Sequence, residues 1–152
     1  IGNFPYNISS QILFKAFDNR DKVTEVVGMF QKEVAERIAC VKGKKKGILS
    51  VLLQAFYDIE YCFTVDNHLF DPPPKVKSGV IKMKRNNRKE LECDEKIFIK
   101  IVKAGYNQRR KTLRNALKSF TLDLNYEIEK LLQKRAEQLD VEEFIFLTKN
   151  VQ

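Results

Sequence analysis

The hydrophobic period of this chain changes once, and this change limits the possible folds more than any other feature. Up to about residue 85, short apolar runs with strand-like and helix-like spacing alternate. From about residue 93, apolar residues recur only at helical spacing. The stretch between them, 86–95 (NNRKELECDE), is polar and is interpreted as a linker. The pattern predicts an α/β part over 1–88 and a small all-α part over 89–152.

Within the first part, two runs are typical of strands. Residues 23–30 (VTEVVGMF) are apolar and β-branched, which favours a buried strand. Residues 58–65 alternate strictly, which predicts a half-buried strand with its odd-numbered residues on one face. Three consecutive prolines in 70–84 (FDPPPKVKSGVIKMK) cannot lie inside a sheet, so they fix a connector that leads into another strand.

Helices are expected between and after these strands. Ser9 or Ser10 can cap a helix whose apolar residues are Ile12, Leu13, Ala16 and Phe17. Two further runs, 31–40 and 48–57, have helical spacing and length. In the second part, Asp140 and Glu143 have the spacing of a capping box for the last helix.

The charge of the chain is concentrated in one segment. The chain has 28 basic and 20 acidic residues, for a net charge of +8. The segment 96–118 contains eight of the basic residues and no acidic ones, so it accounts for the whole excess. On a continuous helix, Arg110, Lys111, Arg114 and Lys118 would occupy one arc, opposite an apolar stripe. Such a segment is typical of a protein that binds a polyanion, although a solvated lysine-rich face has the same composition.

Other features of the composition exclude several classes. No apolar run is long enough to span a bilayer. The three cysteines, Cys40, Cys62 and Cys93, are widely spaced, which suggests neither a disulfide framework nor a zinc site. A reducing cytoplasm is the simplest compartment for such a chain. His68 is the single histidine, and we interpret it as a residue of a surface loop.

The sequence Asn3-Phe4-Pro5-Tyr6 offers a group of functions suited to holding a base. Asn3 has a side-chain carbonyl acceptor, and Pro5 biases Phe4 to an extended conformation that can turn its carbonyl outward. Two acceptors that converge on an exocyclic amine would orient its lone pair toward an electrophile. The ring of Tyr6 offers a face for stacking. A simple turn would have the same residues.

The sequence resembles the ribosomal RNA adenine N6,N6-dimethyltransferases of the KsgA family over nearly all of its 152 residues. The resemblance rests on stretches that occur in family order: GNFPYNISS, MFQKEVAERI, GILSVLLQAFYDIEYCFTV, LFDPPPKVKSGVI, NQRRKTLRNAL and, more weakly, KRAEQLDVEEFIFL. The first is generic to amino-methyltransferases, and PPPKVKSGV is shared with the erythromycin-resistance enzymes. The stretch RRKTLRN favours the small-subunit enzymes.

The resemblance implies roles for individual residues. Asn3 and the carbonyl of Phe4 would accept from N6 of the target adenine, and Asn3 would also lie near the methyl donor, S-adenosylmethionine. Tyr6, following Pro5, would stack on the base, and Phe70 would close over it from the other side. Methyl transfer would then be direct, with positioning and desolvation supplying much of the rate.

The two basic segments would bind the RNA backbone without reading its sequence. The implied contacts are Arg109, Arg110, Lys111, Arg114 and Lys118 in the second part, and Lys42, Lys44, Lys45 and Lys46 in the loop 41–47.

The resemblance also predicts what these residues lack. A methyltransferase of this type has a glycine-rich loop after its first strand, but no two of the six glycines are spaced Gly-x-Gly. We therefore expect the chain to be the C-terminal part of a Rossmann-like methyltransferase sheet followed by a small all-α domain, with the cofactor half upstream. Alone, it should bind S-adenosylmethionine very weakly and not methylate RNA. The strand at 23–30 should lack sheet neighbours and promote self-association.

Three alternative functions remain at this point. A ribosome-assembly or transcription factor could keep the RNA-binding surface without catalysis, although the intact motif at 3–6 disfavours it. A 23S rRNA methyltransferase of the macrolide-resistance type is disfavoured by RRKTLRN. A DNA adenine methyltransferase would not explain the later motifs.

Overall fold

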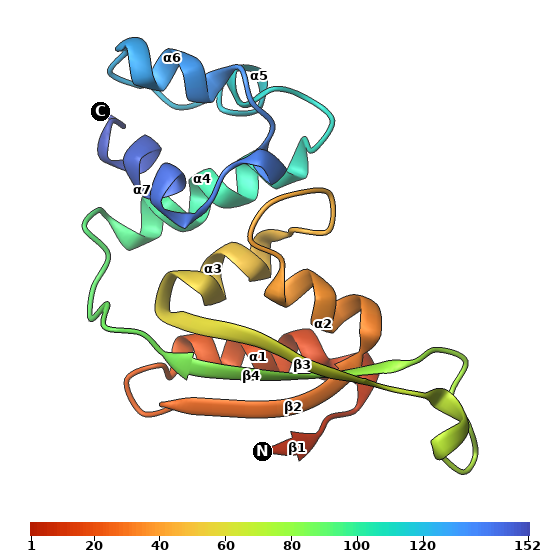
Figure 1. The fold of residues 1–152 in the computed structure, drawn as a ribbon. Coiled ribbons are helices and arrows are strands. Elements are labelled where there is room, and N and C mark those ends of the chain that lie inside the picture. Colours follow the sequence, from red (N-terminus) through yellow and green to blue (C-terminus); the bar gives the residue numbers. More distant parts are fainter.

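The computed structural model describes residues 1–152 and contains one four-stranded sheet of order β1-β2-β4-β3 (Figure 1). The strands are β1 (Gly2–Asn3), β2 (Glu25–Gln31), β3 (Tyr57–Val65) and β4 (Ser78–Arg85). β1 runs parallel to β2, whereas β4 is antiparallel to both β2 and β3. The predicted strands at 23–30 and 58–65, and the strand after the prolines, are confirmed.

Three helices pack beside this sheet. They are α1 (Ser9–Asp18), α2 (Lys32–Ala39) and α3 (Ile48–Phe56), and Figure 1 shows α2 and α3 between the sheet and the second part. The strand residues that face these helices are apolar and buried, among them Phe30, Ile81 and Met83. Phe17 of α1 packs on Phe56 of α3, with ring centroids 5.8 Å apart. The helical predictions for 9–17, 31–40 and 48–57 are therefore confirmed.

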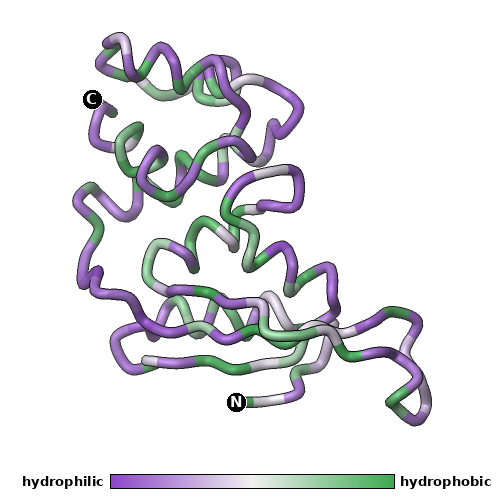
Figure 2. The backbone as a smooth tube through the Cα atoms, viewed as in Figure 1, coloured by the Kyte–Doolittle hydropathy of each residue, from purple (hydrophilic) through white to green (hydrophobic).

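The second part contains helices, turns and one isolated β-bridge, but no strand. Its helices are α4 (Glu95–Asn107), α5 (Leu113–Ala116), α6 (Tyr126–Leu132) and α7 (Val141–Lys149). The linker before α4 is irregular and almost wholly hydrophilic, as Figure 2 shows. Both α4 and α7 contact α3 of the first part. One continuous cluster of 31 buried residues therefore extends through both parts.

The prediction that the odd-numbered residues of 58–65 share one face is wrong beyond Tyr61. Tyr61 pairs with Ile81, but Phe63 pairs with Val80, which leaves Cys62 as an extra residue. This β-bulge moves Phe63 to the opposite face of the sheet, where its side chain is 57% exposed. A bulge cannot be read from alternation alone, because it changes the phase of the pattern without changing the residue types.

Two predictions about the ends of elements have different outcomes. The prediction that Ser9 or Ser10 caps α1 is wrong, because Ile8 is the N-cap residue and Ser9 instead donates from Oγ to the carbonyl of Tyr6 at 3.1 Å. The capping box of α7 is confirmed. The amide of Glu143 donates to Asp140 Oδ1 at 2.9 Å, and the amide of Asp140 donates to Glu143 Oε1 at 3.2 Å.

The prediction that the strand at 23–30 lacks neighbours is also wrong. β2 pairs with β4 along its whole length and with β1 at Gly28 and Met29. The outer edge of the sheet on this side is instead the short strand β1. None of the helices has the length and apolar character needed to cross a membrane.

Candidate functional site

The motif Asn3-Phe4-Pro5-Tyr6 lies at the carboxyl end of β1. Asn3 is the last residue of the strand and is exposed, while Pro5 precedes a short 3-10 helix, η1 (Tyr6–Ile8). Because β1 and β2 are parallel, their carboxyl ends lie at the same rim of the sheet. Ligands of open α/β sheets bind at this rim. The structure therefore places the predicted motif where such a site is expected.

The ring of Phe4 is anchored on glycine. A Cβ atom on Gly28 would lie 2.4 Å from Phe4 Cε2, and one on Gly2 would lie 2.9 Å from Phe4 Cε1. The same ring packs on Phe30, with centroids 5.3 Å apart. The side chain of Phe4 is therefore a packing element, which fixes the backbone that carries the Phe4 carbonyl. Sequence reasoning missed Gly28, although a glycine inside an apolar strand is a known sign of close approach.

Tyr6 is held by a residue that the sequence did not single out. Its hydroxyl forms a hydrogen bond with the hydroxyl of Ser78, the fully buried first residue of β4. The connector between β3 and β4, residues 66–77, ends at this serine and contains Phe70. Tyr6 is thereby linked to the connector that carries the second predicted aromatic.

Phe70 is half-buried and follows the 3-10 helix η2 (Asn67–Leu69) in that connector. Figure 1 shows the connector projecting beyond the ends of β3 and β4. The rings of Phe70 and Tyr6 do not form an aromatic pair with each other. His68 is exposed, as predicted, and its Nδ1 lies 2.8 Å from Asp66 Oδ1; hydrogen bonds from His68 lower the pKa of Asp66.

The basic segment after α4 is exposed but is not one helix. Its cations lie in the turn at 108–112, in the four-residue α5 and in the turn that follows, so the predicted continuous arc is wrong. The apolar side of the prediction is correct at Leu113 and Leu117, which are buried. The cations form two groups. Those without an acidic partner are Arg110, Lys111 and Lys118, whereas Arg109 and Arg114 form ion pairs with Glu137 and Glu129.

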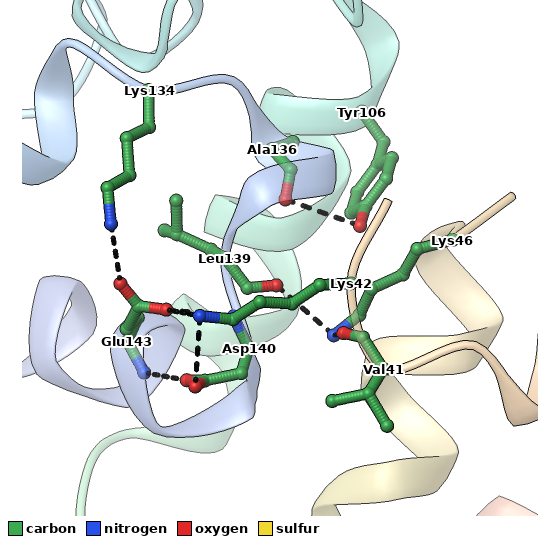
Figure 3. A network of polar contacts seen from close by, with 9 residues as sticks. All are labelled: Val41, Lys42, Lys46, Tyr106, Lys134, Ala136, Leu139, Asp140 and Glu143. Carbon is green, nitrogen blue, oxygen red and sulfur yellow. Dashed lines mark hydrogen bonds and ion pairs between the residues drawn. The ribbon is translucent and has the colours of Figure 1, made fainter. Parts of the chain in front are cut away.

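The prediction that Lys46 belongs to an exposed phosphate-binding loop is wrong. Its side chain is fully buried, and its Nζ donates to the carbonyl of Leu139 at 3.1 Å and to that of Val41 (Figure 3). Burial lowers the pKa of Lys46 to about 8. The residue joins the loop 41–47 to the start of α7 and cannot contact a solvent-side phosphate. The burial of Lys46 could not be predicted from the sequence, because the other lysines of the loop have the same side chain and differ only in their surroundings.

The other lysines of this loop are also mostly engaged. Lys42 Nζ lies 3.0 Å from a carboxylate oxygen of Glu143 and 3.6 Å from one of Asp140, and the bond to Glu143 raises the pKa of Lys42 (Figure 3). Lys45 is paired with Glu36, which raises the pKa of Lys45. Lys44 forms no ion pair. Only this lysine of the loop therefore offers a free charge in the structure.

The architecture and the motif at its rim define a class. A mixed α/β sheet with Asn-Phe-Pro-Tyr at a strand end is followed by a helical part, and this architecture is similar to that of methyltransferases of known structure. Two solved structures share the fold. A dimethyladenosine transferase from Plasmodium falciparum is 25% identical, with a TM-score of 0.79 over 95% of this chain and 63% of that chain. The 23S rRNA methyltransferase ErmE is 19% identical, with a TM-score of 0.73 over 99% of this chain and 63% of that chain.

The family is established by sequence comparison. The model of the family "Ribosomal RNA adenine dimethylase" matches residues 1–151, and the chain belongs to this family. It is 67% identical over 150 residues to the ribosomal RNA small subunit methyltransferase A of Cytophaga hutchinsonii, covering 97% of this chain and 58% of that protein. The corresponding protein of Flavobacterium johnsoniae is 58% identical over 153 residues, covering all of this chain and 59% of that protein. The chain thus spans somewhat over half the length of these relatives.

Proposed function

We propose that this chain is part of an enzyme that transfers methyl groups from S-adenosylmethionine to N6 of two adjacent adenines near the 3′ end of small-subunit ribosomal RNA. The observation that supports this most directly is the placement of Asn3-Phe4-Pro5-Tyr6 at the carboxyl end of β1, with Tyr6 held by Ser78. The family and the high identity to small-subunit methyltransferases support the substrate. A ribosomal substrate favours a cytoplasmic site of action.

The residues divide the work of holding the base. Asn3, exposed at the strand end, and the carbonyl of Phe4 accept hydrogen bonds from the adenine amine and aim its lone pair. The anchoring of the Phe4 ring on Gly28 keeps that carbonyl in place. Tyr6 stacks on one face of the base, and Phe70 on the connector covers the other. Fixing the amine in this way replaces a bimolecular encounter with a positioned one, which contributes much of the rate in such a transfer.

The residues fit S-adenosylmethionine only in part. Asn3 is an exposed polar group at the rim, suited to contact the end of the cofactor that bears the methyl group. The six glycines are spread through the chain without a Gly-x-Gly spacing, so these 152 residues contain no cofactor-binding fingerprint. When bound, the cofactor supplies an electrophilic methyl group. We propose that the cofactor-binding half belongs to a more N-terminal part of the Rossmann-like sheet, and that this chain alone is inactive.

We further assign the catalytic role to 1–88 and the RNA-binding role to the helical part, 89–152. Within the helical part, the cations without acidic partners, Arg110, Lys111 and Lys118, support contacts with the RNA backbone. In the first part, Lys44 has the same character. Self-association through the outer edge of β1 is a separate proposal, which light scattering of the purified chain at high concentration tests; a clean monomer would contradict it.

Substitution of Asn3 tests the proposal. In the full-length gene product, we expect Asn3→Ala to lower the turnover of small-subunit RNA methylation by roughly 100-fold, because the amine loses an acceptor that orients it. Mass spectrometry of the RNA measures the dimethylated adenines. Asn87→Ala, an exposed residue of the linker, is the matched control and should methylate normally. Normal turnover by Asn3→Ala would exclude the assigned site, and methylation of large-subunit RNA instead would favour the macrolide-resistance class.

A further inference from the structure

A groove runs along the junction between the two parts of the molecule. It has a volume of about 470 Å³ and is lined by residues of α1, α2, the start of α3 and α4. We call it the junction groove. Phe14, Ile48 and Tyr106 contribute to its apolar surface, and Arg37, Lys103 and Arg109 supply its positive charge. No acidic residue lines it, although the chain has 20 of them.

The junction groove continues into a second basic pocket. That pocket, of about 500 Å³, is lined only by residues 107–111 and shares Arg109 with the groove. Neither pocket has a carboxylate in its lining. Lys103, Arg110 and Lys111 have no acidic partner and give the two adjoining hollows an excess of positive charge, which attracts an anion. An elongated polyanion could therefore contact both at once.

The other end of the junction groove approaches the predicted base site. Ser10 and Phe14 line the groove from α1, which begins at Ser9 immediately after η1. Ser9, the first residue of α1, donates to the carbonyl of Tyr6 at 3.1 Å. The junction groove thus starts on the helix that follows the base site, and the adjoining pocket extends to the exposed cations Arg110 and Lys111.

The side chains within the junction groove suit a nucleotide better than a plain phosphate. Phe14 is 37% exposed and is the one exposed large apolar residue of α1. Aromatic rings beside cations are the recurring elements of single-stranded nucleic-acid binding, because any base can stack while the cation contacts the backbone. Lys103 is exposed and forms no ion pair, whereas Arg37 and Arg109 are paired with Glu33 and Glu137.

We propose that the junction groove binds an unpaired nucleotide of the same RNA that enters the base site, with the base on Phe14 and its phosphate at Lys103. This inference rests on the proposed function and adds to it a route for the strand between the two parts. Phe14 and Lys103 lie outside the motif and outside RRKTLRN. An acidic protein segment would also meet the charge but would have no use for a stacking ring.

Binding of a fluorescein-labelled RNA hairpin, whose unpaired loop contains two adjacent adenines, tests this proposal by anisotropy across a salt series. The full-length gene product is used. We expect Phe14→Leu to weaken binding roughly 5-fold or more without changing the salt slope, because it removes stacking and no charge. Lys103→Gln should reduce the slope of log K against log salt by about 0.7, the value for one phosphate contact on a single strand.

Two controls make the outcome decisive. Phe14→Tyr keeps the aromatic plane and should bind as the wild type does, while Lys149→Gln removes an exposed lysine of α7 that lines neither pocket and should leave the slope unchanged. If the wild type binds and Phe14→Leu and Lys103→Gln match it in affinity and slope, the junction groove is not an RNA site and the proposed function stands. If the wild type does not bind the RNA, both fall.

Discussion

Two loops of the first part differ in where their hydrogen-bond partners lie. The loop 41–47 is bonded to residues far away in the sequence: the amide of Gly43 donates to the carbonyl of Glu137 at 2.8 Å, and Lys46 donates to that of Leu139. Most hydrogen bonds of the connector 66–77 join two of its own residues. Asn67 donates from its side chain to the carbonyl of Pro74 at 3.1 Å.

The two loops show that charge and exposure are not the same property. The loop 41–47 has four lysines and resembles an RNA-binding loop, but it clasps the two parts of the protein together. Gly43 has a φ of 116°, which favours glycine and lets the loop turn back toward the helical part. The connector has two lysines, two aspartates and three prolines, so its charges balance, yet it is the loop that projects into solvent with an aromatic residue (Figure 1). The first loop sets the geometry between the parts, and the second is free to meet a substrate.

The contact between the loop 41–47 and the helical part can be weakened by substitution of Arg109. This guanidinium donates to the carbonyls of Lys46, at 3.1 Å, and of Lys44, and it pairs with Glu137 at 3.1 Å. We expect Arg109→Ala to lower the free energy of unfolding by about 2 kcal/mol, because charge-assisted hydrogen bonds to backbone carbonyls are lost. Urea denaturation measures this. Arg110→Ala, an exposed neighbour without such bonds, should change it by less than about 0.5 kcal/mol; equal losses in both would contradict the contrast.

The second prediction concerns the loop 41–47 and the pH dependence of the free energy of unfolding that Lys46 causes. The pKa of Lys46 is about 8 in the folded protein, below its ordinary value of 10.5, because the ammonium is buried. Above pH 8 the unfolded chain therefore holds more protons than the folded one, so stability rises with pH. Between pH 8 and 9.5 the gain from this group is on the order of 1–2 kcal/mol. The measurement is the free energy of unfolding across this range.

Two variants test whether Lys46 causes this rise of stability with pH. The charges of Asp140, Glu143, Lys42 and Cys40 also act on the pKa of Lys46, and all four residues are present in the wild type and in both variants. Lys46→Met should lack the rise, whereas Lys44→Met, which removes the exposed lysine of the same loop, should keep it. A rise of equal size in Lys46→Met would show that the buried ammonium is not its source.

Much of the fold could be predicted from the sequence because the elements are locally encoded. The strand at 23–30, the helices over 31–40 and 48–57 and the capping box of α7 follow from period and capping residues within a few positions. The continuous basic arc failed because the segment is divided between a turn, the four-residue α5 and a second turn, and only its apolar residues, such as Leu113, obey the period. The bulge at Cys62 failed for a similar reason, since register is set by the partner strand.

The candidate site could be predicted only where a contiguous motif carries it. Asn3 to Tyr6 are adjacent in sequence, so their common position at the rim follows from one strand end. Ser78 is 72 residues from Tyr6, and Gly28 is paired with Gly2 across the sheet, so neither role is visible without the fold. The burial of Lys46 could not be predicted for the same reason, because its hydrogen-bond partner Leu139 is 93 residues away.

A substitution in the connector 66–77 should have the smallest effect on stability, in contrast to the substitution of Arg109, which contacts the loop 41–47. Phe70 is half-buried on a segment bonded mainly to itself, so Phe70→Ala should lower the free energy of unfolding by less than about 1 kcal/mol. Methylation by the full-length gene product should nevertheless fall at least about 10-fold, because the base loses one of its stacking partners. Leu69→Ala, at the neighbouring residue that is 69% exposed, should change neither quantity. If Phe70→Ala destabilised the protein as much as Arg109→Ala and left methylation intact, the connector would be a structural loop like 41–47.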